Sequence, residues 1–255
     1  MNGFTELTNR ELDALSVSGS ILSRALKAVV NAVRAGVSTK ELDRIAEHEI
    51  RSAGAAPSFF GYNGYPASLC VSINDEVVHG IPKEDRILHD GDVVGFDLGA
   101  SYDGIHTDMA TTIFIGKPVP PDVLRLLTTT RTALDAALTV LRSGITTGDI
   151  GSTVQQIVES DGFSVVRDLV GHGVGRSIHE EPSVPNFGTA GSGERIVEGM
   201  VLAIEPMVTE GGYAVVTDSD GWTVRTKDGS RAAHEERTVI VGRNGCRTIT
   251  PWNYG

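Results

Sequence analysis

Two stretches of this chain recur at the same distance along the sequence, and this repeat restricts the possible folds more than any other feature. Residues 36–42, GVSTKEL, resemble residues 144–150, GITTGDI, at an offset of 108, with six of the seven positions similar. Residues 91–97, GDVVGFD, align with residues 199–205, GMVLAIE, at that same offset. Helix signals and strand signals both coincide, so shared composition does not explain the match. We expect two similar halves.

Each half begins with a pair of amphipathic helices. Apolar residues recur at intervals of three and four over residues 12–33 and again over residues 123–141, which predicts two helices that end near Gly36 and Gly144. A shorter helix follows each of them. Residues 38–41, STKE, form a capping-box pattern at the start of the first of these shorter helices.

The aligned strand of each half ends in a carboxylate, which is Asp97 in the first half and Glu205 in the second. If the halves pack around a pseudo-twofold axis, both carboxylates come to the junction between them. Functional sites often lie in the cleft at such a junction. We therefore expect a single domain over residues 1–255, with halves at about residues 10–118 and 119–250 and a site between them.

Composition and charge exclude several classes of protein. Hydrophobic residues make up 40% of the chain and charged residues 22%, as in soluble globular proteins with a large core. The net charge of −11 disfavours binding to DNA and to anionic membranes. The two cysteines have no paired spacing, and no signal sequence or long uncharged apolar run is present. We expect a cytoplasmic protein that binds neither DNA nor a membrane.

Two aspartates are predicted to share one face of a hairpin. Residues 92–115 read as two apolar strands around the turn Asp103-Gly104. That turn pairs Gly99 with Asp108, so Asp97 and Asp108 lie diagonally on one face. A solvated hairpin face is the commoner arrangement for a random pair of carboxylates. Because Glu205 occupies the equivalent place in the repeat, we instead interpret the pair as part of a metal site, in which a cation offsets their repulsion.

Pattern alone does not resolve the roles of three histidines and two glutamates. His172 and His179 lie seven residues apart among glycines, without the lysine and Ser/Thr of a phosphate-binding loop. A single histidine is more often a hydrogen-bonded structural residue, and His79 is ambiguous for the same reason. Near the C-terminal end, strand alternation leaves open whether Glu235 or Glu236 points toward the site.

Eight segments in order along the chain resemble those of the type I methionine aminopeptidases. They are residues 61–66, 79–82, 91–94, 103–108, 171–176, 179–182, 204–207 and 236–238. The resemblance covers nearly the whole sequence. It implies an α+β pita-bread fold, in which two pseudo-twofold-related halves form a central antiparallel sheet flanked by helices, as a single catalytic metallopeptidase domain.

The resemblance also implies two divalent metal ions per chain. Asp108 and Glu236 would bridge the ions, Asp97 would chelate one of them, and His172 with Glu205 would complete the other. Four carboxylates and one imidazole form an oxygen-rich set that suits cobalt, manganese or iron, and zinc less selectively.

The activity implied is removal of the initiator methionine from nascent polypeptides with a small second residue. A water or hydroxide held by the two metal ions would attack the first peptide bond. Glu205 would transfer a proton. His179 would stabilise the oxyanion that develops, and His79 would contact the substrate backbone near the departing nitrogen.

The substrate's methionine side chain would enter a pocket formed by Phe59, Tyr62, Tyr65, Cys70, Ile178 and Trp222. A thioether suits a pocket of aromatic and sulfur-containing side chains. Three residues depart from the family pattern. Phe59 stands where many bacterial relatives have cysteine, Ile178 where phenylalanine is common, and Arg237 where histidine is usual. The first two would reshape the pocket, and Arg237 would pair with a ligand carboxylate.

Three other functions fit these residues less well. X-Pro aminopeptidases and prolidases usually carry an additional N-terminal domain, for which 255 residues leave no room. An inactive relative that binds a protein or nucleic acid would be expected to lose metal ligands, yet all five are present. A hydrolase with a serine or cysteine nucleophile lacks support, because there is no Gly-x-Ser-x-Gly motif and no base motif beside Cys70. We expect a monomer that acts on nascent N-termini, with transient ribosome association.

The chain's own N-terminus provides a test of this specificity. Asn2 is bulkier than the residues that the family favours after methionine. We therefore expect the protein to keep Met1, and intact-mass measurement on native material checks this. A mass lower by one methionine residue would contradict it.

Overall fold

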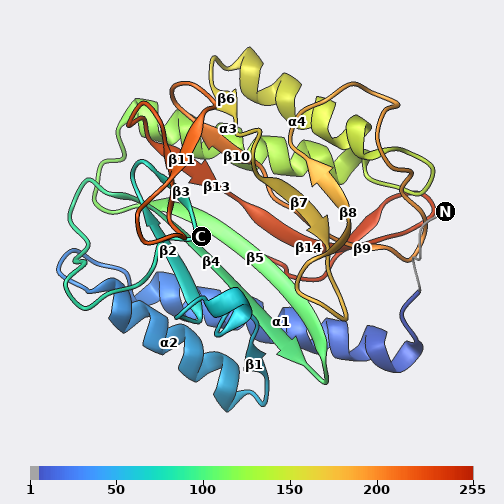
Figure 1. Cartoon of the computed structure of the whole chain (residues 1–255), viewed down its shortest axis with the longest axis horizontal. Coiled ribbons are helices and arrows are strands. Elements are labelled where there is room, and N and C mark those ends of the chain that lie inside the picture. Colours follow the sequence, from blue (N-terminus) through green and yellow to red (C-terminus); the bar gives the residue numbers. More distant parts are fainter. Residues whose placement is uncertain (1–5, 255) are drawn as a thin grey trace.

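The computed structural model describes residues 6–254 as four α-helices and a set of antiparallel strands (Figure 1). Met1 and Asn2, on which the processing prediction rests, lie outside these residues. The helices are α1 (Asn9–Ala32), α2 (Thr39–Ser52), α3 (Pro121–Val140) and α4 (Thr147–Ser160), with a short 3-10 turn at Tyr62–Gly64. The strands are β1 (Ala56–Pro57), β2 (Leu69–Ile73), β3 (Glu76–Val78), β4 (Val93–Tyr102), β5 (Ile105–Phe114), β6 (Ser164–Val165), β7 (Val170–Gly173), β8 (Glu180–Pro185), β9 (Val201–Ile204), β10 (Met207–Thr209), β11 (Val215–Thr217), β12 (Val224–Thr226), β13 (Ala232–His234), β14 (Glu236–Val241) and β15 (Cys246–Thr248).

The four predicted helices are confirmed, and their caps differ in detail. Thr146 and Asp149 form a complete capping box at the start of α4. At the start of α2, the Ser38 side chain accepts a hydrogen bond from the backbone of Glu41, but the expected return bond is not made. The Glu41 carboxylate instead lies 3.5 Å from Arg34. The capping box predicted there is therefore only half formed.

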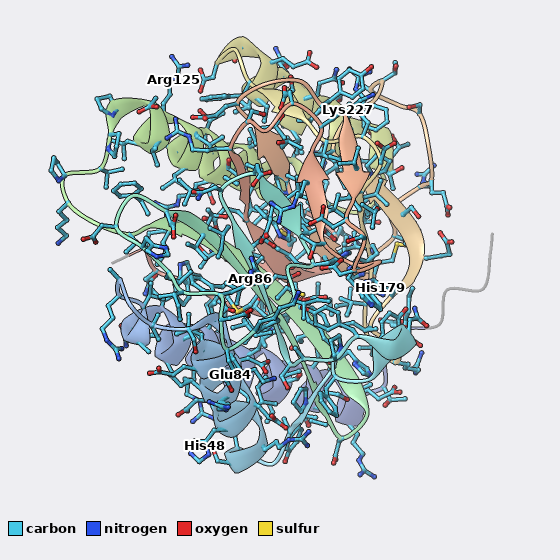
Figure 2. The ribbon with its side chains drawn as sticks, turned by 60° about the vertical axis from the view of Figure 1, so that its left-hand side comes forward. His48, Glu84, Arg86, Arg125, His179 and Lys227 are labelled. Carbon is cyan, nitrogen blue, oxygen red and sulfur yellow. The ribbon has the colours of Figure 1, made fainter. Side chains whose placement is uncertain are left out.

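A nine-stranded antiparallel sheet forms the centre of the molecule. Its order is β1-β4-β5-β14-β9-β7-β8, with β2 also paired to β4 and β15 to β14. Figure 1 shows α1 and α2 at one end of this sheet and α3 and α4 at the other. In Figure 2, His48 on α2 and Arg125 on α3 point outward at opposite ends of the view, as exposed helix positions should. The predicted α+β pita-bread architecture is confirmed.

Several elements begin 108 residues apart. The helix α2 begins at Thr39 and α4 at Thr147, and each is 14 residues long. The strands β4 and β9 begin at Val93 and Val201. Isolated β-bridges also recur at this spacing, joining residue 38 to 87 and residue 146 to 195.

Each helix pair covers its own apolar core. One core includes Leu22, Leu26 and Leu42 from α1 and α2 against Phe96 of β4. The other packs the apolar faces of α3 and α4 against β9 and β14. Between the two cores, polar residues of β4, β5 and β14, and Glu205 directly after β9, are free to form a site. Among the residues that the structure describes, no helix is long and apolar enough to cross a membrane.

The segment after β15 packs against α1 at a glycine. A Cβ atom added to Gly19 would lie 2.3 Å from the Ile249 carbonyl oxygen and 2.6 Å from its side chain. Hence only glycine at this helical position permits the C-terminal segment to approach the helix so closely.

We predict that Gly19→Ala destabilises the protein by about 1–3 kcal/mol, because overpacking outweighs the better helix propensity of alanine. Urea unfolding followed by circular dichroism measures the change. The exposed neighbour Ser20 provides the control, and Ser20→Ala should leave stability nearly unchanged. A Gly19→Ala protein as stable as the wild type would contradict the packing described.

Candidate metal centre

The hairpin of β4 and β5 places Asp97 and Asp108 on one face, as predicted. Gly99 pairs with Asp108, and Asp97 pairs with Ala110 two residues further along β5. Asp103 and Gly104 both have positive φ angles at the turn. One carboxylate oxygen of Asp97 and one of Asp108 are buried without a hydrogen-bond partner among the described residues. Leaving such atoms unpaired is costly, so a ligand is expected to bind them.

Two further candidate ligands come from β7 and the end of β9. His172 on β7 pairs with Ala203, and Glu205 directly follows β9. The Nε2 atom of His172 lies 3.4 Å from Glu205 Oε1 and 4.0 Å from Asp108 Oδ2. The Nδ1 atom of His172 lies 2.8 Å from the Gly173 carbonyl oxygen, which can only accept, so Nδ1 carries the proton. The Nε2 lone pair is therefore free to bind a cation beside the two carboxylates.

The structure shows which of the neighbouring residues Glu235 and Glu236 points toward the site. Glu236 lines the same cavity as the aspartates, and Glu235 points to the opposite face. Asp108, His172 and Glu236 each offer a ligand atom within 4.8 Å of the others. The expectation that Arg237 pairs with a ligand carboxylate is wrong. Its Nη2 atom lies 3.5 Å from Glu235 Oε2 instead, because neighbouring β-strand residues alternate between faces and Arg237 shares its face with Glu235.

The carboxylates of this cluster strongly favour their protonated forms. Burial raises the pKa of Asp97, Asp108, Glu205 and Glu236 above their ordinary values. The charges of Asp97 and Glu205 raise the pKa of Asp108 further, and those of Asp108, Glu205 and Asp97 do the same for Glu236. Repulsion among buried carboxylates is relieved either by protons or by cations.

Burial lowers the pKa of the neighbouring histidines. The pKa of His172 falls to about 4, first through burial and then through His179. The pKa of His79 also falls to about 4, through burial and then through His234 and His179. Both imidazoles are neutral at pH 7, which is the form that binds metals or donates a hydrogen bond without adding charge.

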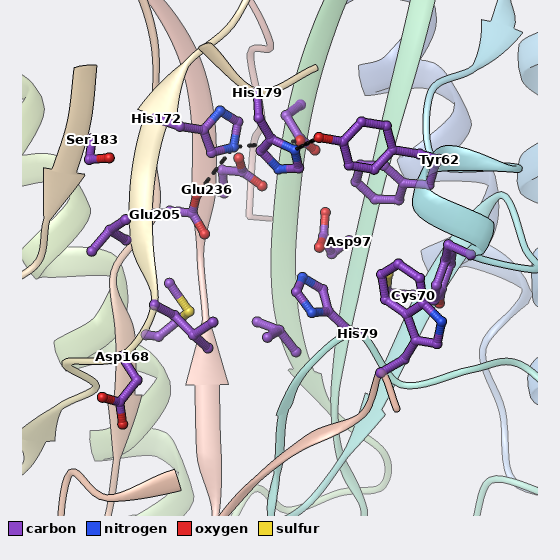
Figure 3. Close-up of a pocket in the computed structure, with 18 of the residues that line it drawn as sticks. Tyr62, Cys70, His79, Asp97, Asp168, His172, His179, Ser183, Glu205 and Glu236 are labelled. Carbon is purple, nitrogen blue, oxygen red and sulfur yellow. Dashed lines mark hydrogen bonds and ion pairs between the residues drawn. The ribbon is translucent and has the colours of Figure 1, made fainter. Parts of the chain in front are cut away.

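The predicted site residues surround one cavity of about 550 Å³ (Figure 3). Figure 3 shows His172, Glu205 and Glu236 on one side of it, Cys70 and Tyr62 on the other, and Asp97 between. The side away from His172 is aromatic, since the ring of Tyr65 packs edge-to-face on Trp222 at 5.1 Å and on Phe59 at 6.5 Å. All the predicted site residues except Ile178 line the cavity.

Ile178 does not line this cavity. It is buried in a cluster with Phe59 and packs close to Gly99 behind the cavity wall. Tyr62 lies at the exposed rim, where its hydroxyl is 2.9 Å from Nδ1 of His179. The rings of His179 and His172 meet edge-to-face at 4.3 Å. The cavity is thus lined with histidines on the same side as the carboxylates.

Sequence reasoning missed His234. This buried side chain lies 3.5 Å from Glu205 Oε2, and its Nε2 atom has no hydrogen-bond partner among the described residues. His234 is two residues before Glu236, so strand alternation would have placed both on one face. The cavity is also lined by Met207, which ends the motif at residues 204–207, and by Leu169 and the acidic residue Asp168, which no motif indicated.

The residues present fit bound cations. Buried carboxylates with unpartnered oxygens and a neutral imidazole with a free nitrogen form a hard donor set with excess negative charge. Protein atoms alone do not satisfy these groups, whereas a divalent ion would satisfy both the hydrogen-bonding deficit and the charge.

Comparisons with known proteins agree with this geometry. Residues 13–243 match the sequence profile of metallopeptidase family M24. The methionine aminopeptidase of Clostridium acetobutylicum is 45% identical over 240 residues, covering 94% of this chain and 96% of the relative. The crystal structure of a methionine aminopeptidase from Thermotoga maritima superposes with a TM-score of 0.95 at 39% identity, over 98% of this chain and 100% of that one.

More distant structures share the fold. A prolidase from Pyrococcus furiosus superposes with a TM-score of 0.78 at 22% identity, covering 97% of this chain and 66% of that chain. At this identity the likeness shows the architecture alone.

We predict that the metal-free protein loses stability as the pH rises from 7 to 8. In this pH range, carboxyl groups with raised pKa values keep their protons in the folded state, whereas the same groups in the unfolded chain have released them. Each such group therefore lowers the free energy of unfolding by up to about 1.4 kcal/mol per pH unit. The histidines have lowered pKa values and oppose this trend only below about pH 6.5, where the unfolded chain takes up their protons. Urea unfolding of chelator-treated protein measures the slope.

Excess divalent metal should abolish this slope, and Asp97→Asn should reduce it. Stability that is constant or rises over this interval without metal would contradict the cluster's electrostatics.

Proposed function

We propose that this chain, which belongs to metallopeptidase family M24 and within it to the methionine aminopeptidases, removes the initiator methionine from new polypeptides with a small second residue. As a member of this family, it is a metallo-hydrolase with methionine aminopeptidase activity. The observation that carries the finer proposal is one cavity that is lined both by the five candidate metal ligands and by an aromatic slot.

The aromatic slot would bind the methionine side chain. Phe59, Tyr65, Trp222 and Cys70 line it, and burial raises the pKa of the Cys70 thiol well above its usual range, so the thiol is neutral. An uncharged slot of rings and sulfur suits a flexible thioether. Phe59 is larger than the cysteine that many bacterial relatives have at this position, and it would narrow the slot on the side of Tyr65.

Five side chains would hold two divalent cations: Asp97, Asp108, His172, Glu205 and Glu236. We propose that the cations are cobalt, manganese or iron, because this oxygen-rich ligand set is less selective for zinc. When bound, these ions would supply Lewis acidity and lower the pKa of the attacking water. The five side chains themselves fix where the first peptide bond of the substrate must lie relative to the slot.

Three residues would assist the reaction directly. Glu205 would accept a proton during the reaction and pass it on. The Tyr62 hydroxyl is hydrogen-bonded to Nδ1 of His179. When the hydroxyl donates to Nδ1, the ring proton lies on Nε2, which would donate a hydrogen bond to the developing oxyanion. The neutral ring of His79, packed edge-to-face against Trp222, would contact the substrate backbone near the departing nitrogen.

The substrate indicates where in the cell the protein acts and with which partners. Removal of initiator methionine acts on nascent N-termini, so we propose a cytoplasmic monomer that associates transiently with ribosomes. The net charge of −11 gives no support for tight contact with ribosomal RNA.

Asp97→Ala tests site and function together. We expect chelated wild-type protein supplied with manganese, iron or cobalt to release methionine from a Met-Ala-Ser peptide and to bind two ions per chain. Asp97→Ala should bind less metal and lose activity by more than about 100-fold. Removing a residue that merely hydrogen-bonds to a metal ligand already lowers metal affinity or activity by about 10- to 100-fold, and Asp97 would be a ligand itself. Metal content and methionine release are measured on the same samples.

The control is Asp135→Ala on the exposed face of α3, which should match the wild type in both measurements. Release of the first residue from X-Pro peptides, with no metal-restored release from Met-Ala-Ser, would reject the assignment.

A further inference from the structure

The strands β5 and β14 meet through few backbone pairs, although each carries a candidate metal ligand. Within the described residues, Glu236 pairs with Ala110 and Arg237 with Met109, whereas β4 and β5 pair over their whole length. We call this junction the β5–β14 seam. Asp108 lies on one side of it and Glu236 on the other, and their carboxylates belong to the same three-residue cluster. Side chains must therefore help to fix the seam.

Arg237 spans the β5–β14 seam directly behind Glu236. Its guanidinium is buried, with 4% of the residue exposed. The Nη1 atom donates hydrogen bonds to the carbonyl oxygens of Ala110 at 2.8 Å and Glu236 at 2.5 Å. One rigid, planar group thus ties the backbones of the two strands together, on the face opposite to the Glu236 carboxylate.

Tyr254, near the C-terminal end of the chain, fixes Arg237 from outside. Its hydroxyl accepts a hydrogen bond from Arg237 Nη2 at 2.8 Å and donates one to Glu235 Oε2 at 2.8 Å. The Arg131 guanidinium lies 4.2 Å from the centre of the Tyr254 ring and donates from Nε to Glu235 Oε1 at 3.2 Å. Thr111 of β5 donates to that same oxygen at 3.1 Å. Each polar group of this network has a partner.

The Tyr254 hydroxyl bridges Arg237 and Glu235 and takes the place of a direct hydrogen bond between them. The Arg237 Nη2 atom lies 3.5 Å from Glu235 Oε2, with the hydroxyl bonded to both. Without the hydroxyl, a buried guanidinium would lose an acceptor and a carboxylate that is 1% exposed would lose a donor. The Arg237–Glu235 ion pair would then shorten to a direct hydrogen bond, and the guanidinium would move away from the carbonyl oxygens of Ala110 and Glu236.

We propose that Tyr254 is a positioning residue of the metal centre. By holding Arg237 on the β5–β14 seam, it keeps Asp108 and Glu236 at the separation that binds cations, although it touches neither carboxylate. This inference rests on the proposed function, because it assumes that these two residues are metal ligands.

Tyr254→Phe in the full chain tests the proposal, since it keeps the ring over Arg131 and removes only the hydroxyl. Isothermal titration calorimetry with Mn²⁺ on chelated protein gives the Kd. We expect the Kd to weaken by about 10-fold or more, the size of effect typical of groups that orient metal ligands. Glu235→Gln should weaken it similarly, and the double variant should be no worse than the more affected single variant, because both act through Arg237.

Tyr213→Phe is the matched control. Tyr213 also lies under an arginine, with the Arg167 guanidinium 4.2 Å from its ring, and it does not line the cavity. Its variant should bind Mn²⁺ as the wild type does. Urea unfolding of the metal-free variants is measured in parallel, since a residue that merely stabilises the fold would lower stability and leave the Kd unchanged.

An unchanged Mn²⁺ Kd in Tyr254→Phe, beside normal binding by the wild type, would overturn the positioning role and leave the proposed function standing. Absence of Mn²⁺ binding by the wild type would overturn both.

Discussion

Burial of four carboxyl groups around one cavity is the constraint on which the rest of this structure depends. Asp97 and Asp108 come from one hairpin, whereas Glu205 and Glu236 come from segments far along the sequence, and protein atoms alone leave part of this cluster unpartnered. Burial and mutual repulsion raise their pKa values, so the charged forms of these groups are costly unless a cation binds them. The two helix-covered cores on either side hold the strands in place against that repulsion. A fold that maintains such a cluster is organised for cations.

Much of this arrangement could be predicted from local rules. The two-residue turn at Asp103-Gly104 sets the register of its hairpin, so the shared face of Asp97 and Asp108 followed from counting. The helices could also be predicted, because the apolar periodicity and the glycines that end them lie within each helical segment. The pairing between distant strands is not encoded in this way. Only the folded chain shows Glu236 turned to the cavity and Glu235 to the face where Arg131 lies.

The errors have a common physical origin in long-range packing. Arg237 was expected to pair with a ligand carboxylate, but it pairs with Glu235, on the face that Tyr254 and α3 cover. Ile178 was expected in the methionine pocket, but it is buried in the same apolar cluster as Phe59 and does not line the cavity. The shared architecture with a prolidase at 22% identity shows that the fold alone does not define the substrate. The rings that line the slot beside the carboxylates come from residues outside the strands of the sheet.

Anomalous diffraction from crystals grown with Mn²⁺ tests the central claim most directly. If the buried carboxylates exist to bind cations, two anomalous peaks should appear in the cavity, both within coordination distance of Asp108 and Glu236, with the five side chains close to the positions described. A cavity that shows no anomalous density at saturating Mn²⁺, with the carboxyl groups protonated and hydrogen-bonded to one another, would contradict it.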